Sequence, residues 1–130
     1  MPQENSASLR VAIADDSPAF LAAAANHIAG LPGFELAGTA SSSQQALNLV
    51  QSSTPDVLLL DLGLAPKRAL EIVRRVKSTP SAPAVVALAL FHTPETVAAA
   101  KQAGADALVG KESFVAGLRQ ALANLFPAAA

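Results

Sequence analysis

Five short runs of apolar residues alternate along this chain with five segments of helical periodicity, and this alternation limits the possible folds more than any other feature. Strands that alternate with helices build a parallel sheet, because right-handed crossovers place the helices on its two faces. We therefore predict an α/β fold with a doubly wound sheet of five strands in the order 2-1-3-4-5 and five helices. The expected strands are 9–14, 34–40, 57–61, 84–90 and 107–109; the expected helices are 18–31, 44–51, 69–76, 94–103 and 114–125. Asp16 or Ser17 is expected to cap the first helix before Pro18, Thr93 and Pro94 to open the fourth, and Ser113 to cap the fifth.

Size and composition argue against several functional classes. A chain of 130 residues suits one domain, here 9–126, with 1–8 as a disordered tail and 127–130 as a C-terminal tail or linker stub. The net charge is -1 and no stretch is rich in Lys and Arg, which argues against direct binding to nucleic acid or to an anionic membrane surface. Cysteine is absent and no apolar run is long enough to span a membrane, so the composition favours a cytoplasmic protein.

The most informative segment is the apolar run Val57–Leu60, which is followed by Asp61. A continuous apolar run is typical of a central parallel strand buried on both faces, and open α/β sheets bind their ligands at the carboxyl ends of such strands. Asp15 and Asp16 follow the first strand, which neighbours the third in the predicted order. Lys111 follows the fifth strand at the same edge. We therefore expect three carboxylates and one lysine to gather at this edge of the sheet.

With these residues in this order, nearly the whole chain resembles the receiver domain of bacterial two-component response regulators. Asp15 and Asp16 are similar to the acidic pair of that family, Asp61 to its phospho-accepting aspartate, and Lys111 to its lysine. The triplet Gly-Ala-Asp at 104–106 precedes the fifth strand, as it does in the family. The resemblance implies a flavodoxin-like fold and phosphorylation of Asp61 by a histidine kinase or phosphotransfer protein. It implies no catalysis beyond the domain's own phosphoryl transfer and dephosphorylation.

The chemistry of phosphoryl transfer explains why these residue types occur together. A carboxylate can attack a phosphoryl group, but both groups are anionic and repel each other. Mg²⁺ binds carboxylate and phosphoryl oxygens, so it suits a cluster of Asp15, Asp16 and Asp61. The ammonium group of Lys111 can pair with a phosphoryl oxygen. The family resemblance adds the backbone carbonyl of Gly63 as a further ligand of the metal.

Two positions depart from the family pattern. The Ser or Thr that ends the fourth strand in the family corresponds to Ala89, and the aromatic residue of the fifth strand corresponds to Leu108. In the family, that hydroxyl bonds the phosphoryl group and moves the following loop while the aromatic side chain turns inward. A hydrogen bond to a charged group contributes about 1.5–3 kcal/mol, so its loss should weaken switching by about ten- to a hundredfold. We also expect the bulky Leu90 and Phe91 to crowd the phosphoryl site.

Three hypotheses about function remain open. The leading one is a phospho-accepting receiver of a phosphorelay that signals through contact with a downstream protein or an effector domain. The second is a pseudo-receiver that docks or dimerises without phosphorylation, which Ala89 and Leu108 favour. The third, an aspartyl phosphatase of the haloacid dehalogenase type, needs a second Asp two residues after Asp61, where Gly63 stands. A partner or a second copy is expected on the face of the fourth helix, fifth strand and fifth helix, with these exposed positions: Ala98, Lys101, Gln102, Arg119 and Gln120.

Overall fold

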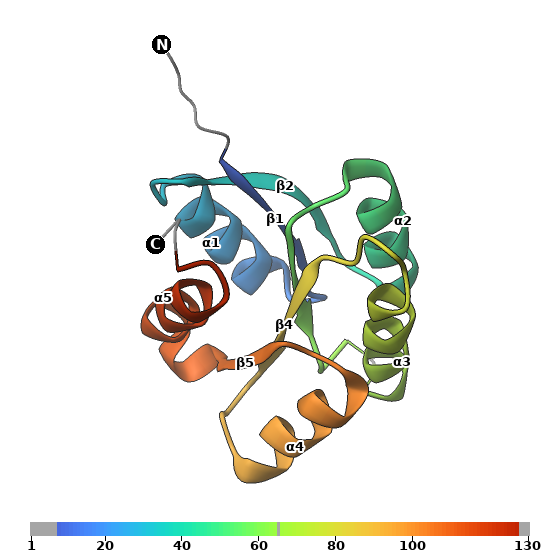
Figure 1. Ribbon diagram of the computed structural model, residues 1–130. Coiled ribbons are helices and arrows are strands. Elements are labelled where there is room, and N and C mark those ends of the chain that lie inside the picture. Colours follow the sequence, from blue (N-terminus) through green and yellow to red (C-terminus); the bar gives the residue numbers. More distant parts are fainter. Residues whose placement is uncertain (1–7, 65, 128–130) are drawn as a thin grey trace.

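A computed structural model describes residues 8–64 and 66–127 of the chain, without the side chains of 66–68. Five parallel strands form one sheet in the order β2-β1-β3-β4-β5, as predicted (Figure 1). The strands are β1 (Leu9–Ala14), β2 (Phe34–Ala40), β3 (Val57–Asp61), β4 (Ala84–Ala89) and β5 (Ala107–Gly110). The helices are α1 (Pro18–Ala29), α2 (Ser43–Ser53), α3 (Pro66–Lys77), α4 (Pro94–Ala103) and α5 (Phe114–Leu125), with a 3-10 turn η1 (Lys111–Ser113) before α5.

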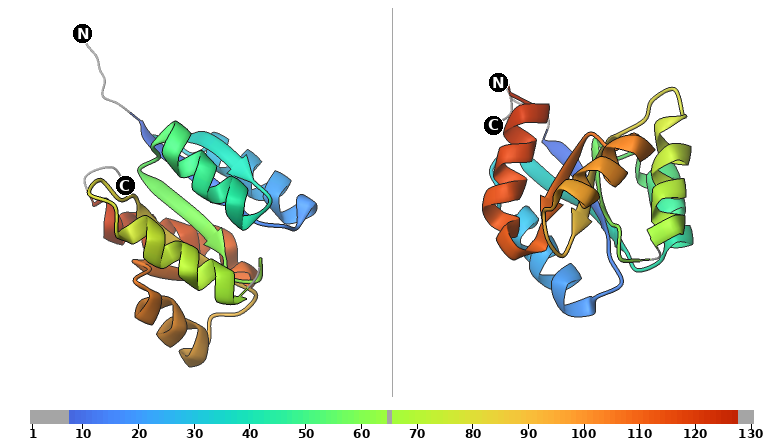
Figure 2. Two further views of the ribbon diagram at one scale, coloured as in Figure 1. Left: turned by 90° about the vertical axis from the view of Figure 1, so that its right-hand side faces the viewer. Right: turned by 90° about the horizontal axis from the view of Figure 1, so that it is seen from below.

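The central strand β3 is buried on both faces. Its first four residues are fully buried and alternate between two apolar layers. Val57 and Leu59 pack with side chains of α1 and α5, whereas Leu58 and Leu60 pack with side chains of α2 and α3. Figure 2 shows the sheet between these two layers of helices. Each such side chain contributes about 1.5–3 kcal/mol on burial. Because β3 packs against helices on both faces, its carboxyl end is held in place, and Asp61 with it.

Two helices begin as the sequence predicts, with a capping hydroxyl followed by proline. The Ser17 hydroxyl accepts a hydrogen bond from the N–H of Phe20 at the start of α1, and the Thr93 hydroxyl accepts one from the N–H of Thr96 at the start of α4. The prediction that Ser113 caps the last helix is wrong. The turn η1 leads directly into α5, and the Ser113 side chain makes no capping hydrogen bond within the described chain.

The fourth strand is shorter than predicted. β4 ends at Ala89, and Leu90, which the apolar pattern placed inside a buried strand, is 70% exposed. An apolar run does not reveal where the neighbouring strand stops. The last pair between β4 and β5 joins Ala89 to Gly110, so β5 is one residue longer than predicted and β4 one residue shorter.

Aspartate side chains join neighbouring strands at the amino-terminal edge of the sheet. The Asp56 carboxylate accepts a hydrogen bond of 2.8 Å from the backbone N–H of Arg10. The Asp106 carboxylate accepts hydrogen bonds from the N–H of Val85 and from the ammonium group of Lys77, both at 2.8 Å. The Gly-Ala-Asp triplet that contains Asp106 therefore has a structural role, because it ties β5 to β4 and to α3.

The predicted tails at 1–8 and 127–130 lie almost wholly outside the described residues, so the boundaries at 9 and 126 stay predictions. Among the described helices, none has the length and apolar character that crossing a membrane requires.

Candidate functional site

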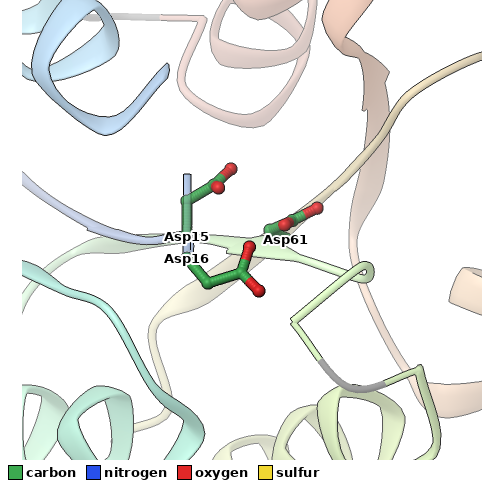
Figure 3. Close-up of side chains that lie close together, drawn as sticks. All are labelled: Asp15, Asp16 and Asp61. Carbon is green, nitrogen blue, oxygen red and sulfur yellow. The ribbon is translucent and has the colours of Figure 1, made fainter. Parts of the chain in front are cut away.

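Three aspartates lie together at the carboxyl-terminal edge of the sheet. Asp15 and Asp16 follow β1, and Asp61 is the last residue of β3, which pairs with β1. One carboxylate oxygen from each residue lies within 4.8 Å of the others, and Figure 3 shows the three carboxyl groups around a common space. Asp15 and Asp61 are buried, whereas Asp16 is exposed. The strand order 2-1-3-4-5 thus brings together residues that are far apart in the sequence.

Lys111 reaches this cluster from the turn after β5. Its Nζ lies 2.6 Å from Oδ2 of Asp15 and 3.4 Å from Oδ1 of Asp61. The same atom is 4.4 Å from the centre of the Phe20 ring, a distance at which a cation and an aromatic ring attract each other. The Phe20 ring packs edge-on against Phe114 of α5, with 5.1 Å between the ring centres. The lysine is therefore held between two carboxylates and an aromatic face, and its charge partly offsets theirs.

Backbone N–H groups hold the two buried carboxylates in place. The N–H of Ser17 donates to Oδ1 of Asp15 at 2.8 Å, and the N–H of Gly63 donates to Oδ1 of Asp61 at 3.0 Å. Oδ2 of Asp15 is buried and accepts no hydrogen bond of regular geometry from the described residues. Burying such an oxygen is costly unless a cation lies beside it. The site therefore requires positive charge near Asp15.

Burial raises the pKa of Asp61 above the ordinary value for an aspartate. The negative charge of Asp15 raises this pKa further, while the hydrogen bond from the Gly63 N–H and the charge of Lys111 lower it without cancelling the effect of burial. The charged form of Asp61 is therefore disfavoured in the folded protein before any metal binds.

We expect Asp61→Asn to raise the free energy of unfolding of the metal-free protein at neutral pH. Because the folded-state pKa is above the unfolded value of about 3.9, the folded state binds the proton more tightly, so Asp61 stabilises the fold only in acid. That stability is lost as the pH rises through the folded pKa. Urea unfolding in chelator between about pH 4 and about pH 7 should show the advantage of Asn growing with pH. An advantage that shrinks with pH would contradict the assignment.

The cluster opens into a hollow of about 610 Å³ between the β4–α4 loop, the start of α4 and α3. Asp16, Asp61 and Lys111 form much of its polar lining. This volume lies within the range of about 300–1,000 Å³ that is usual for ligand sites. Leu90 and Phe91 also line it, and because they are 70% and 61% exposed they form its rim and do not fill it.

Residues 11–123 match the family model described as the response regulator receiver domain. The chain belongs to this family. Protein-glutamate methylesterase/protein-glutamine glutaminase 5 of Myxococcus xanthus is 34% identical to this receiver over 109 residues, which are 83% of the receiver and 31% of that protein. Nitrate/nitrite response regulator protein NarL of Escherichia coli is 27% identical over 118 residues, 88% of the receiver and 55% of that protein. The receiver thus spans about half, or less, of the length of these curated relatives.

Solved receivers have the same fold. A two-component response regulator of the LuxR family from Aurantimonas superimposes with a TM-score of 0.82 at 25% identity, covering 92% of this receiver and 85% of that chain. A chain in the complex of the P1 domain of CheA3 with CheY6 from R. sphaeroides superimposes with a TM-score of 0.79 at 24% identity, covering 95% and 100%. This chain is therefore a receiver domain of a two-component response regulator in both sequence and fold.

The receiver family binds Mg²⁺ at an acidic pocket, and the residues present here fit that ion. All three candidate side chains offer the oxygen ligands that Mg²⁺ prefers, and they lie close enough to share one ion. The closeness of the three carboxylates is the main indication, and the buried Oδ2 of Asp15, which has no regular hydrogen bond, adds an oxygen that a cation can neutralise. Lys111 now lies against that oxygen, so its ammonium group and a metal ion would compete for the same place.

Ala89 and Leu108, the two departures from the family pattern, lie on the neighbouring strands β4 and β5. Ala89 is the last residue of β4, is 7% exposed and forms part of the wall of the hollow beside Asp61. It offers a methyl group and no hydrogen-bonding side-chain atom. Leu108 lies on β5 opposite Ala87 and is half-buried.

Phe20 belongs to the site although the sequence does not indicate it. In the sequence it is one of several apolar residues at helical spacing, and no local signal marks its contact with Lys111. The contact joins α1 to the turn after β5, so it depends on the packing of elements that are distant in the chain.

Proposed function

We propose that this receiver accepts a phosphoryl group on Asp61 from a phosphohistidine of a histidine kinase or phosphotransfer protein. Asp15, Asp16, Asp61 and the backbone carbonyl of Gly63 would hold the Mg²⁺ ion for the reaction. One arrangement carries the proposal: a carboxylate at the end of the central strand, beside two others, 3.4 Å from the ammonium group of Lys111 and facing a hollow. The complex of CheY6 with the P1 domain of CheA3 supports a donor protein of this kind.

Asp61 attacks through one of its carboxylate oxygens. The N–H of Gly63 holds Oδ1, which leaves Oδ2 as the nucleophile. A bond forms from Oδ2 to phosphorus while the phosphorus–nitrogen bond of the phosphohistidine breaks, and the leaving imidazole nitrogen keeps the electron pair and takes up a proton. Lys111 pairs with a phosphoryl oxygen through a charge-assisted hydrogen bond. Mg²⁺, when bound, supplies the positive charge that lets two anionic groups approach each other.

The output of the receiver would run through a protein contact on the face of α4, β5 and α5. A downstream protein, an effector domain or a second copy of the chain could occupy this face. The five side chains expected there are all exposed: Ala98, Lys101, Gln102, Arg119 and Gln120.

Incubation with Mg²⁺ and acetyl phosphate should add the mass of one phosphoryl group to the purified chain, because Asp61 lines the hollow and lies beside the ammonium group of Lys111. Intact mass spectrometry over time measures the gain. Asp61→Asn, which removes the nucleophile and keeps the size of the side chain, should show none.

A gain that persists in Asp61→Asn would place the acceptor at another residue. If the chain gains no mass while its circular dichroism stays native, the phospho-acceptor proposal fails and a phosphorylation-independent docking module takes its place.

A further inference from the structure

Glu112, the residue after Lys111, reaches back across the edge of the sheet to the β4–α4 loop. Its Oε2 accepts a hydrogen bond of 3.3 Å from the backbone N–H of His92. The loop that it contacts, residues 90–92, carries the two apolar side chains at the rim of the hollow. A carboxylate in the turn after β5 thus holds the backbone of a loop that follows β4.

Gly110 makes this contact possible. A Cβ atom at this position would lie 1.8 Å from Oε1 of Glu112 and 3.0 Å from the backbone nitrogen of His92. The backbone of Gly110, with φ −81° and ψ 135°, is one that any residue can adopt. A side chain at this position would displace the Glu112 carboxylate, so the glycine leaves free the space that this contact occupies.

The contact lies one residue along the backbone from the acidic cluster's lysine. Asp15 lies 2.6 Å from the ammonium group of Lys111, Glu112 follows Lys111 in the turn η1, and Glu112 holds His92. At the end of β4, where the family has a hydroxyl to link the site to the same loop, Ala89 has a methyl group. The link through Glu112 bypasses that position.

We propose that Glu112 is a positioning residue that couples Lys111 to the β4–α4 loop and so takes over the role of the hydroxyl that Ala89 lacks. The ammonium group of Lys111 can turn from Asp15 toward a phosphoryl oxygen on Asp61. It now lies 3.4 Å from Oδ1 of Asp61. Any shift of Lys111 moves the adjacent Glu112, and the loop follows because its backbone is bonded to that carboxylate. This inference rests on the proposed function in one respect: phosphorylation of Asp61 is the event that moves Lys111.

The first test measures the contact itself in chelator, without phosphoryl donor. Amide hydrogen exchange at His92, followed by NMR, should become about threefold faster in Glu112→Ala, since its one hydrogen bond to the carboxylate, long at 3.3 Å and exposed, is lost. Glu112→Gln, which keeps an oxygen acceptor, should restore most of the protection. Glu95→Ala serves as the control, because Glu95 is an exposed carboxylate on the same hollow whose side chain makes no hydrogen bond within the described chain.

The second test measures the coupling by a double-mutant cycle. Lys111→Met should shift the amide resonance of His92 in the parent chain, and this shift should disappear in the Glu112→Ala background. Gly110→Ala offers a disruption that leaves both side chains in the sequence, and it should also remove the shift. If Lys111→Met does not fold, a titration of the parent chain and of Glu112→Ala with Mg²⁺ replaces it, since a cation at Asp15 displaces Lys111.

Unchanged exchange in Glu112→Ala, or an equal shift of His92 with and without Glu112, overturns the inference. Neither the exchange nor the double-mutant cycle requires phosphorylation. A chain that gains no mass from acetyl phosphate but passes both tests would disprove the proposed function alone, and the reverse pattern would disprove the coupling alone.

Discussion

Lys111→Met should lower the free energy of unfolding of the metal-free protein by about 3–5 kcal/mol, the usual cost of leaving one member of a buried ion pair without its partner. Asp15 is fully buried, and the ammonium group of Lys111 lies 2.6 Å from its Oδ2. No described residue gives that oxygen a hydrogen bond of regular geometry. Methionine keeps most of the length of the side chain but lacks the ammonium group, so the change removes the charge beside Asp15 together with its contact with the Phe20 ring.

Urea unfolding in chelator measures this effect. Lys101→Met, on the exposed side of α4, is the matched control and should change the unfolding free energy by no more than about 0.5 kcal/mol. Added Mg²⁺ should restore part of the loss in Lys111→Met, because a divalent cation can take over the neutralisation of Asp15. A loss below about 1 kcal/mol would mean that the pair behaves like a surface ion pair and that Asp15 finds another partner.

Mg²⁺ at a hundred times its dissociation constant should raise the unfolding free energy of the parent protein by about 2.7 kcal/mol, and Asp16→Asn should remove most of this gain at the same Mg²⁺ concentration. Asp16 suits this test because it is exposed and forms no ion pair among the described residues. Its substitution therefore leaves the metal-free fold almost unchanged and removes one charged ligand from the cluster. A weaker site binds less ion, and the stabilisation falls with it.

Thermal or urea unfolding with and without Mg²⁺ gives both numbers for each variant. Glu95→Gln is the control, since it removes a carboxylate from the same hollow but outside the group of three. The Mg²⁺ gain should survive in this control. If Asp16→Asn keeps the full stabilisation by Mg²⁺, Asp16 is not a ligand, and Asp15 and Asp61 hold the ion.

The sequence predicts the sheet well because apolar runs and helical periodicity can each be recognised within one short segment. The apolar run Val57–Leu60 and its alternation with helical segments indicate a buried parallel strand, and chain order with right-handed crossovers then determines which strands are neighbours. Asp15, Asp16 and Asp61 follow as a group, since the carboxyl ends of neighbouring parallel strands meet at one edge. Their roles in metal binding and phosphoryl transfer stay predictions.

What the sequence misses depends on distances between elements. The exposure of Leu90 follows from the point at which β5 stops pairing with β4. The turn η1 leads directly into α5, where a Ser113 cap was expected. The contact of Phe20 with Lys111 joins two elements about ninety residues apart. Helical periodicity and capping rules describe one element at a time, so they contain no information about such contacts.

The aspartates at the two edges of the sheet differ in how well their oxygens are satisfied. At the amino-terminal edge, Asp56 and Asp106 accept regular hydrogen bonds from backbone or lysine. At the carboxyl-terminal edge, Asp15 keeps an oxygen without one. One edge of the sheet is therefore structural only, whereas the other combines stability with sensitivity to charge. Substitutions at the carboxyl-terminal edge change the unfolding free energy and the response to cations together, so only the amino-terminal edge allows stability to be tuned by itself.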